Sequence, residues 1–492
     1  MIVSTTENVT RDAESPAPPP EYARPRRTPG AGVQALAMRL HFYAGVFVAP
    51  FILIAAITGA LYAISPTLEQ ITSHDLLKVE PGASARPLSD QVAAAVATRP
   101  DLALVAVAPA PEADDTTRVL FSDPSLGESE RRAVFVDPYS ARPIGESVVY
   151  GSSGALPLRT WIDRLHRDLH LGEFGRLYSE LAASWLWVIA LAGLVLWIRR
   201  VRSRRDRDSA RWLFAPDRTK AGRLRAMNWH GAIGVWVLPL LLLLSVTGMT
   251  WSTYAGANIG ELRQQLSWKT PSVSTALPGT AAHPPAAGDH HGADESTPRT
   301  IEIATRIAQL DAVLGAAREA GVTRGVEVSV PSNDDTAFTV KQRRMPGTYT
   351  VDSVAVDGAT GAVTARLDYA DWPLMAKSTN WGIQFHMGLM FGPLNQLLLL
   401  AAMTGLIVVI ALGYRMWWQR RPARGNAGFA LGRPPRRGAL RKASPWVAVP
   451  LIAAAAVIGW FAPLIGISLL GFLTIDLILG IIGRTRQVEK TS

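Results

Sequence analysis

"HFYAGVFVAPFILIAAITGALY", residues 41–62, returns far along the chain as "HGAIGVWVLPLLLLLSVTGMTW", residues 230–251. Aligned without a gap, the two stretches agree at His41/His230, Gly45/Gly234, Val46/Val235, Val48/Val237, Pro50/Pro239, Leu53/Leu242, Thr58/Thr247 and Gly59/Gly248. Both are apolar and about 20 residues long, which is the length that crosses the hydrocarbon core of a bilayer. The sequence therefore contains one membrane-helix pattern twice, and each copy begins with a histidine.

Five apolar runs carry the membrane signal. They lie at about 42–64, 181–198, 231–252, 391–414 and 445–483, and the first four contain no charge. The last run holds one charge, Asp476, and is too long for one simple span. Pro463 near its middle favours a hairpin of two helices, about 446–462 and 464–482, over one long tilted or kinked helix. These runs predict a polytopic, mainly α-helical membrane protein.

The distribution of charge predicts which side each loop occupies. Residues 199–225 carry eleven Lys/Arg against three acids, and residues 415–442 carry nine and no acid. Short basic loops stay in the cytoplasm. The long segments 65–180 and 253–390 hold more acids than bases and are predicted to lie outside. The net charge of +10 therefore reflects topology, and no nucleic-acid partner is expected because the cations flank apolar spans.

The chain contains no cysteine. The outer segments therefore have no disulfides, and Cys-ligated iron–sulfur clusters and covalent c-type haem are excluded. Residues 1–36 are Pro-rich and polar, which predicts a disordered cytoplasmic tail. With no cleavable signal before it, the first span is expected to act as an uncleaved signal anchor.

The doubling extends beyond the opening pair. "LHLGEFG" (169–175) precedes a span ending "GLVLWIRR", and "FHMGLMFG" (385–392) precedes a span ending "GYRMWWQR". The positions paired on these motifs are His170/His386, Gly172/Gly388, Gly193/Gly413 and Trp197/Trp417. "VFVDPYSARPIGE" (134–146) and "VAVDGATGAVTAR" (354–366) both predict strand, tight turn and strand. Each half therefore contains two spans with an outer α+β module between them.

Spans one and three run in the same direction, so the two halves are related by an axis along the membrane normal. The predicted fold is a mainly α membrane protein, with a duplicated four-helix transmembrane core, two outer α+β modules and a C-terminal transmembrane hairpin. The predicted segments are the tail 1–36, first span 37–65, outer module 66–160, outer helix end and second span 161–200, basic loop 201–227, third span 228–252, second outer module 253–376, fourth span 377–420, basic loop 421–444 and hairpin 445–484.

Four histidines at matched positions lie at helix ends, where an ionisable side chain at membrane depth is a functional candidate. His41 and His230 lie at the inner level, and His170 and His386 at the outer level. The levels are about 30 Å apart, at about 1.5 Å per helical residue, so one cofactor cannot bridge them. Across the axis, two opposed imidazoles at each level suit a six-coordinate b-type haem. The sequence therefore predicts heme b near each face, two in all, with these four histidines binding the haem iron.

Neighbouring residues fit this interpretation. Small residues leave room for a flat macrocycle, and nearby arginines are candidates for pairing with its propionates. The glycines are Gly45, Gly234, Gly172 and Gly388, and the arginines are Arg39, Arg164 and Arg167. Arg39 can equally be a positive-inside anchor.

Alternatives remain open at several histidines. His166 lies four residues before His170, on the same helical face, and is an alternative ligand or a propionate partner, although this alignment places Gly382 opposite it. Binding of a metal other than haem iron is a weaker interpretation of these histidines, since H-R-D-L-H lacks the glutamate of the H-E-x-x-H zinc motif. A third interpretation is that these histidines have a structural role or lie at the membrane interface. The remaining histidines, His74, His283, His290 and His291, are expected in outer loops.

"RLHFYAGVFVAPFILIAAITGALY", "LHRDLHLGEFGRL" and "GYRMWWQRRP" resemble the PepSY-associated transmembrane family of bacterial iron-regulated inner-membrane proteins. The resemblance covers most of residues 35–422, including the outer modules, which look like PepSY domains. The family includes siderophore reductases that hold b-type haem. The resemblance implies a bacterial inner-membrane location with periplasmic modules, haem ligation by the matched histidines, and reduction of ferric siderophores or other iron chelates.

Competing functions are kept beside this one. PepSY modules elsewhere resemble inhibitors or chaperones of peptidases, so a peptidase-binding or regulatory membrane protein without redox activity is the main alternative. A transporter is disfavoured, because Asp476 is the sole acid within the apolar runs. The electron donor, a quinol or a protein, is not readable from the sequence, and the oligomeric state, a homodimer included, stays open.

Overall fold

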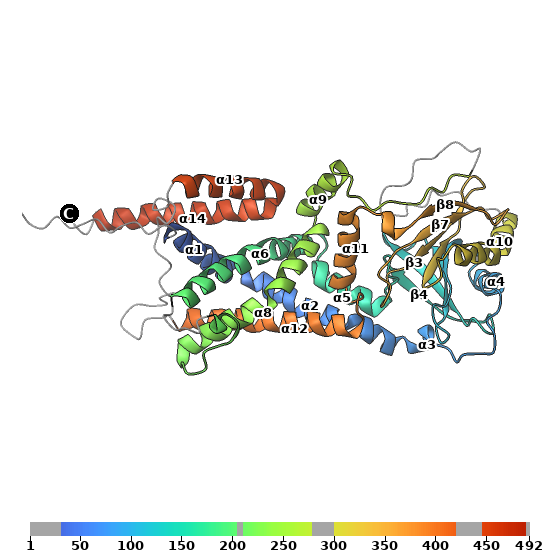
Figure 1. Ribbon diagram of the computed structural model, residues 1–492, viewed down its shortest axis with the longest axis horizontal. Helices are drawn as coiled ribbons and strands as arrows, with labels where there is room; N and C mark the ends of the chain where they lie inside the picture. Colours follow the sequence, from blue (N-terminus) through green and yellow to red (C-terminus); the bar gives the residue numbers. More distant parts are fainter. Residues whose placement is uncertain (1–30, 204–209, 278–299, 420–444, 489–492) are drawn as a thin grey trace, which may run out of the picture.

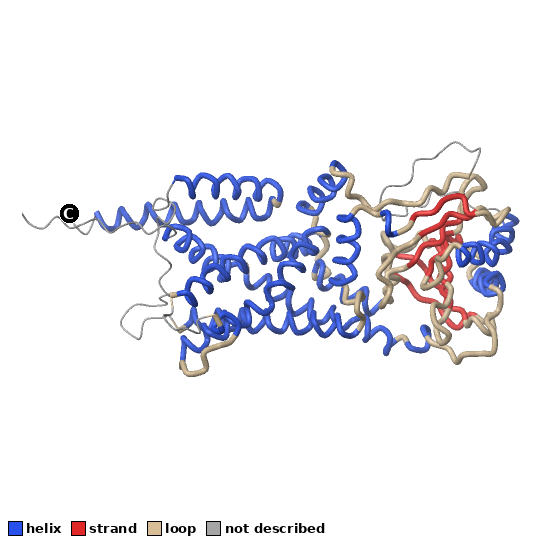
Figure 2. Tube along the Cα trace, viewed as in Figure 1, coloured by secondary structure: helices blue, strands red, loops and turns tan. Residues whose placement is uncertain are grey.

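The computed structural model describes residues 31–203, 210–277, 300–419 and 445–488. Figure 1 shows long helices running side by side along the longest axis, and Figure 2 shows the strands gathered at one end. His283, His290 and His291 lie outside the described residues, as do most of the predicted tail and all of the second basic loop, 421–444.

The described residues include five helices that are long and apolar enough to cross a membrane. They are α2 (Ala49–Thr72), α6 (Glu173–Arg202), α8 (Gly222–Thr250), α12 (Pro393–Trp418) and the Pro463–Ile482 part of α14 (Pro463–Val488). At about 1.5 Å per residue, 20 helical residues match the roughly 30 Å of a bilayer core. The chain is therefore a mainly helical, multi-pass membrane protein, as the apolar runs predict.

The first predicted span is made of two helices, α1 (Ala31–Phe47) and α2, which meet at Val48. Pro50 lies just after this junction, and a proline lacks the N–H that would bind the carbonyl four residues earlier. That carbonyl belongs to Val46, and it accepts a hydrogen bond from the Tyr414 hydroxyl at 3.0 Å. The break therefore provides a polar contact between the first span and α12.

The C-terminal run forms two helices, α13 (Pro445–Phe461) and α14, rather than one long helix. The pair packs beside α6 (Figure 1), where Trp185 Nε1 donates to Ser468 Oγ at 2.8 Å. Asp476, the charge within this run, forms an ion pair with Arg39 of α1 at 2.8 Å. The charge is thus paired inside the helical layer.

Eight strands form one antiparallel sheet in the order β4-β3-β2-β1-β5-β6-β7-β8. They are β1 (Ala103–Ala108), β2 (Thr117–Ser122), β3 (Glu130–Val136), β4 (Pro143–Tyr150), β5 (Val326–Ser329), β6 (Phe338–Gln342), β7 (Ser353–Val356) and β8 (Val363–Leu367). The two outer segments meet at β1 and β5, where Ala106 lies opposite Ser329 and Val107 opposite Val328. They therefore share a single sheet.

The two faces of the sheet differ. Helices α4 (Leu88–Thr98) and α10 (Thr300–Glu319) cover the face away from the bundle (Figure 1). Alternate strand residues such as Val119, Phe121 and Val328 are buried in one apolar core with these helices, because side chains of a strand point to alternate faces. Short helices α5 (Pro157–Asp168) and α11 (Leu374–His386) lie on the other side, between the sheet and the bundle (Figure 1).

The two predicted strand–turn–strand segments are present as β3–β4 and β7–β8. In the first turn, Asp137 accepts hydrogen bonds from the Tyr139 backbone N–H and the Ser140 hydroxyl. In the second, Asp357 accepts them in the same way from residues 359 and 360. The two turns lie 220 positions apart in the sequence, with the same hydrogen-bond pattern.

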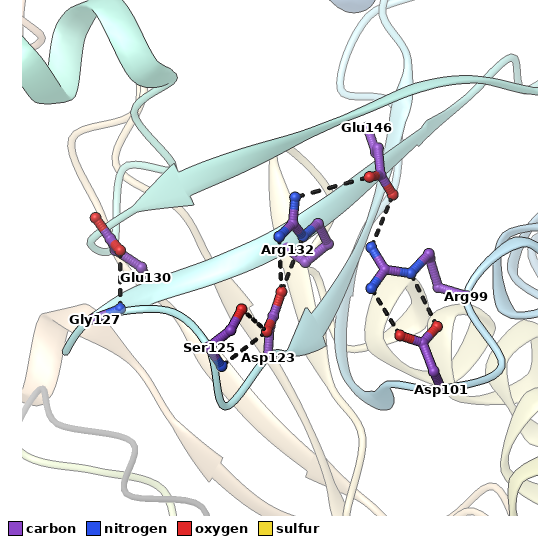
Figure 3. A network of polar contacts seen from close by, with 8 residues as sticks. All are labelled: Arg99, Asp101, Asp123, Ser125, Gly127, Glu130, Arg132 and Glu146. Atoms are coloured by element: carbon purple, nitrogen blue, oxygen red, sulfur yellow. Dashed lines mark hydrogen bonds and ion pairs between the residues drawn. The ribbon is translucent and has the colours of Figure 1, made fainter.

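Figure 3 shows a network of charged side chains around β3 and β4, at one edge of this sheet. Arg132 of β3 donates a hydrogen bond to Asp123 at 2.8 Å. Glu146 of β4 accepts a hydrogen bond from Arg99 at 3.1 Å. Asp123 also accepts from the backbone N–H and hydroxyl of Ser125. The Ser125 hydroxyl, followed by Arg132, lowers the pKa of Asp123 to about 2.

We expect acid to remove the contribution of Asp123 to stability. Its folded pKa is below the unfolded value of about 3.9, so its stabilisation is complete above about pH 4 and is lost as the pH falls towards 2. Asp123→Asn should therefore lower the melting temperature at pH 6 and have little effect near pH 2. Melting of the full chain in detergent, followed by circular dichroism, measures this, with the exposed Asp75→Asn as the control. An equal effect of Asp123→Asn at both pH values would contradict it.

Candidate functional site

The inner histidines face each other, as expected. His41 of α1 and His230 of α8 have ring centroids 5.9 Å apart and planes at 84°. His41 Nδ1 lies 2.9 Å from the Ile189 carbonyl oxygen, and His230 Nδ1 lies 2.8 Å from that of Val409. Because a carbonyl only accepts, each Nδ1 carries the hydrogen, and each Nε2 keeps its lone pair. Neither Nε2 has a hydrogen-bond partner among the described residues.

A glycine supports each inner imidazole. A Cβ at Gly193 would lie 2.8 Å from His41 Cε1, and one at Gly413 would lie 3.6 Å from His230 Cε1. The first distance is shorter than any real contact, so a side chain at Gly193 would displace the ring. These glycines, paired in the sequence, allow α6 and α12 to approach the imidazoles closely.

A cavity of about 720 Å³ includes both inner histidines in its lining. This volume lies within the range of about 300–1,000 Å³ that small-molecule and cofactor sites have. Gly45 and Gly234 also line it, and a Cβ at either would meet nothing within 4 Å, as expected of residues that leave room. The polar lining lies at the helix ends away from the sheet, and includes Gln34, Arg199, Arg200 and Arg223.

The outer pair consists of His166 of α5 and His386 of α11. Their ring centroids are 6.5 Å apart, with planes at 50°. His166 Nδ1 lies 3.0 Å from the Thr58 hydroxyl, and His386 Nδ1 lies 2.6 Å from that of Thr247. Each hydroxyl donates its own hydrogen to a carbonyl one helical turn earlier, at 2.9 and 2.8 Å. Each threonine therefore accepts from Nδ1–H, and Nε2 again keeps its lone pair.

Burial keeps the outer imidazoles neutral. It lowers the pKa of His166 to about 4 and that of His386 to about 3. A neutral imidazole with a fixed Nδ1–H is the form that binds a metal through Nε2. Gly59 supports the His166 ring, since a Cβ there would lie 3.1 Å from Cε1.

His386 lies beside His166, the alternative that the sequence left open, and not beside His170. Helix α5 ends at Asp168, and Leu169 and His170 both have positive φ, so His170 lies beyond the helix. Its ring packs against Trp161, with centroids 5.0 Å apart, and its backbone N–H donates to Asp168. The side chain therefore belongs to the loop after α5.

The expected pairing of His170 with His386 came from the register of the alignment. His166 and His386 are 220 positions apart, like Gly193 and Gly413, whereas His170 and His386 are 216 apart. The turn glycines have the same register: Gly172 has φ 59° and ψ −131°, and Gly392 has φ 56° and ψ −134°. Gly172 therefore corresponds to Gly392, not to Gly388. The constant separation of 220 was the signal in the sequence that identifies His166.

The arginines predicted to pair with propionates have other partners. Arg39 pairs with Asp476, and Arg164 pairs with Glu130. Arg167 donates to the Tyr150 hydroxyl at 2.6 Å. The inner cavity is lined instead by Arg199, Arg200 and Arg223, which were not singled out from the sequence.

The two pairs can each hold a metal between opposed nitrogens. Two metal–nitrogen bonds of about 2 Å, with about half a ring on either side, separate ring centroids by about 6 Å. The separations of 5.9 and 6.5 Å fit this arrangement. Within the described part of the chain, no group of three His, Cys, Asp or Glu is placed to hold a metal ion.

Two comparisons place the chain among known proteins. It is 38% identical over 93 residues to an uncharacterized protein of Pseudomonas aeruginosa, a match that covers 19% of this chain and 21% of that protein. The match thus spans about a fifth of the relative. A family model described as "PepSY-associated TM region" matches residues 38–420, which include both histidine pairs. This chain therefore belongs to the PepSY-associated transmembrane family.

Proposed function

We propose that this protein is an electron-transfer protein of the bacterial inner membrane that holds two b-type haems and reduces ferric chelates on the periplasmic side. The observation that carries the proposal is the arrangement of four neutral imidazoles in two facing pairs, each fixed through Nδ1. In both pairs the Nε2 lone pairs are left to bind iron from opposite sides. When bound, haem supplies one-electron chemistry.

The inner site fits the size and polarity of haem. Its cavity of about 720 Å³ is mostly apolar, and the glycines at 45 and 234 leave space beside the ligands. Arg199, Arg200 and Arg223 would face the propionates at the cytoplasmic end, where charge-assisted hydrogen bonds to carboxylates are strong. His41 and His230 would be the iron ligands.

The outer site fits through its ligands and their orientation. His166 and His386 come from different halves of the chain, and each is oriented by a threonine of the span beside it. Thr58 follows His41 by 17 residues, roughly 25 Å of helix at about 1.5 Å per residue. The two sites would therefore lie near opposite faces of the membrane, and an electron would cross most of the hydrocarbon core between them.

The proposed orientation follows from charge and from the matched positions. The basic segment 199–225 belongs in the cytoplasm, which puts the sheet in the periplasm. We interpret the chain as a duplicated unit, with a four-helix core and one PepSY-like module from each half. The matched glycines, turns and histidines support this interpretation. The electron donor would act at the cytoplasmic side of the inner site, as a quinol or a protein.

Ligand substitutions test the proposal. Purified full-length protein should show a Soret band and about two haems per chain by pyridine haemochrome analysis. His166→Ala or His386→Ala should each remove one haem, and His41→Ala or His230→Ala should remove the other, because an iron loses one of its two axial ligands. His170→Ala is the matched control on the same segment and should keep both. Haem-free wild type from a haem-sufficient host would rule the proposal out, and equal loss with His170→Ala would rule out the outer assignment.

The threonines provide a second test, of the orientation of the outer ligands. Thr58→Val and Thr247→Val keep the side-chain shape and remove the acceptor of the Nδ1 hydrogen bond. Loss of such a partner typically weakens metal binding by about 10–100-fold. Transfer of haem to apomyoglobin should therefore become faster for one haem per chain and stay unchanged for the other. Unchanged transfer of both haems would show that the threonines do not orient ligands.

A further inference from the structure

Three arginines converge between the sheet and the outer ends of the helices. We call Arg118, Arg159 and Arg343 the arginine cluster. They come from β2, from α5 and from the residue after β6, so they belong to both halves of the chain. The segment 153–156, between β4 and α5, lies among them and contacts two of the three.

Arg118 and Arg343 approach the same point. Arg118 Nη1 donates to the Gly154 carbonyl at 3.1 Å, and Arg343 Nη2 donates to the Ser153 carbonyl at 3.4 Å. A Cβ at Gly154 would lie 3.2 Å from the first nitrogen and 3.1 Å from the second. Two guanidinium groups of like charge are therefore held side by side by backbone carbonyls, with glycine allowing the approach.

Arg159 is the most deeply buried of the three, with 4% of its surface exposed. Its nearest carboxylate is Glu69 of α2, 3.6 Å from Nη1, which is beyond hydrogen-bond distance. Glu69 accepts instead from the Leu156 backbone N–H at 2.6 Å. Among the described residues, Arg159 Nε and Nη2 and Arg343 Nε are buried donors without a hydrogen-bond partner. Arg159 also forms a side-chain hydrogen bond with Tyr62, and Arg343 Nε lies 3.9 Å from Glu327. Buried polar groups in folded proteins are nearly always paired, so the remaining donors are available to a ligand.

The carboxylates near these donors act on them through their charge. Asp115 does so on both Arg118 and Arg343. Glu327 accepts a hydrogen bond from Arg131 at 3.0 Å and lies 3.9 Å from Arg343. Burial, followed by the neighbouring Arg343, lowers the pKa of Arg118 to about 10. Burial likewise lowers the pKa of Arg343. Keeping several cations in a poorly solvated place is costly unless an anion compensates them.

We propose that the arginine cluster binds a carboxylate-bearing anion. A guanidinium presents a planar fork of donors that matches a carboxylate, and Arg159 has two adjacent free donors, Nε and Nη2. The carboxylate has two possible sources. One is the propionate of a porphyrin at the outer pair, since Arg159 lies seven residues before His166 on one face of α5, roughly 10 Å along the helix. The other is a carboxylate-bearing iron chelate in the periplasm.

Citrate is the probe for the soluble source. It is titrated calorimetrically into the full-length protein in detergent, at low and high salt. Arg159→Gln and Arg343→Gln should weaken binding at least about tenfold, because each removes a charged donor. Arg164→Gln, on the same helix but paired with Glu130, is the control and should bind as wild type does. The double variant Glu69→Gln/Arg159→Gln avoids an unpaired buried carboxylate, and it should show the same loss if Arg159→Gln misfolds.

The same variants distinguish the porphyrin as the source. In that case a propionate occupies the cluster, so wild type should not bind citrate, whereas His166→Ala protein should bind it. Arg159→Gln should then shift the redox potential of the outer haem and leave the haem content unchanged. The proposal is overturned if neither wild type nor His166→Ala protein binds citrate and the potentials of Arg159→Gln and wild type agree. Haem content is measured independently, so this result would leave the proposed function intact.

Discussion

Four hydrogen bonds from imidazole Nδ1–H to acceptors on neighbouring helices hold the two histidine pairs in place. Each fixes the orientation and tautomer of a buried histidine and leaves its second nitrogen with a free lone pair. A carbonyl of α6 or α12 is the acceptor at the inner level, and a threonine of α2 or α8 at the outer level.

The close approach of the helices depends on glycine. At Gly193 and Gly59 the imidazole occupies the space that a side chain would need, while at Gly45 and Gly234 the space beside the rings stays open. The same residue type therefore does two different things. It brings one helix against the imidazole, and it makes room on the other side. A residue count or a hydropathy profile does not separate these two uses, which only become distinct when the helices are packed.

The sequence predicted the membrane helices and the inner pair well, because both depend on local signals. Uncharged runs of about 20 residues define spans, and the ungapped match between residues 41–62 and 230–251 fixes His41 opposite His230. The outer pair was harder, since two histidines one turn apart, His166 and His170, were both available. The separation of 220 that joins Gly193 to Gly413 selects His166, but the similar "HLG" and "HMG" motifs suggested a different register. The Arg39–Asp476 ion pair could not be predicted, because no sequence pattern connects two residues so distant in the chain.

The shared sheet explains how the outer pair keeps its geometry. His166 and His386 are carried by short helices that follow β4 and β8, the two edge strands of the sheet. Had each outer segment formed a separate sheet, the distance between these helices would vary with any movement of one module against the other. Pairing of β1 with β5 joins the modules through backbone hydrogen bonds and a common apolar core under α4 and α10. A contact at the centre of the sheet therefore joins the two segments that carry these rings, whose centroids are 6.5 Å apart.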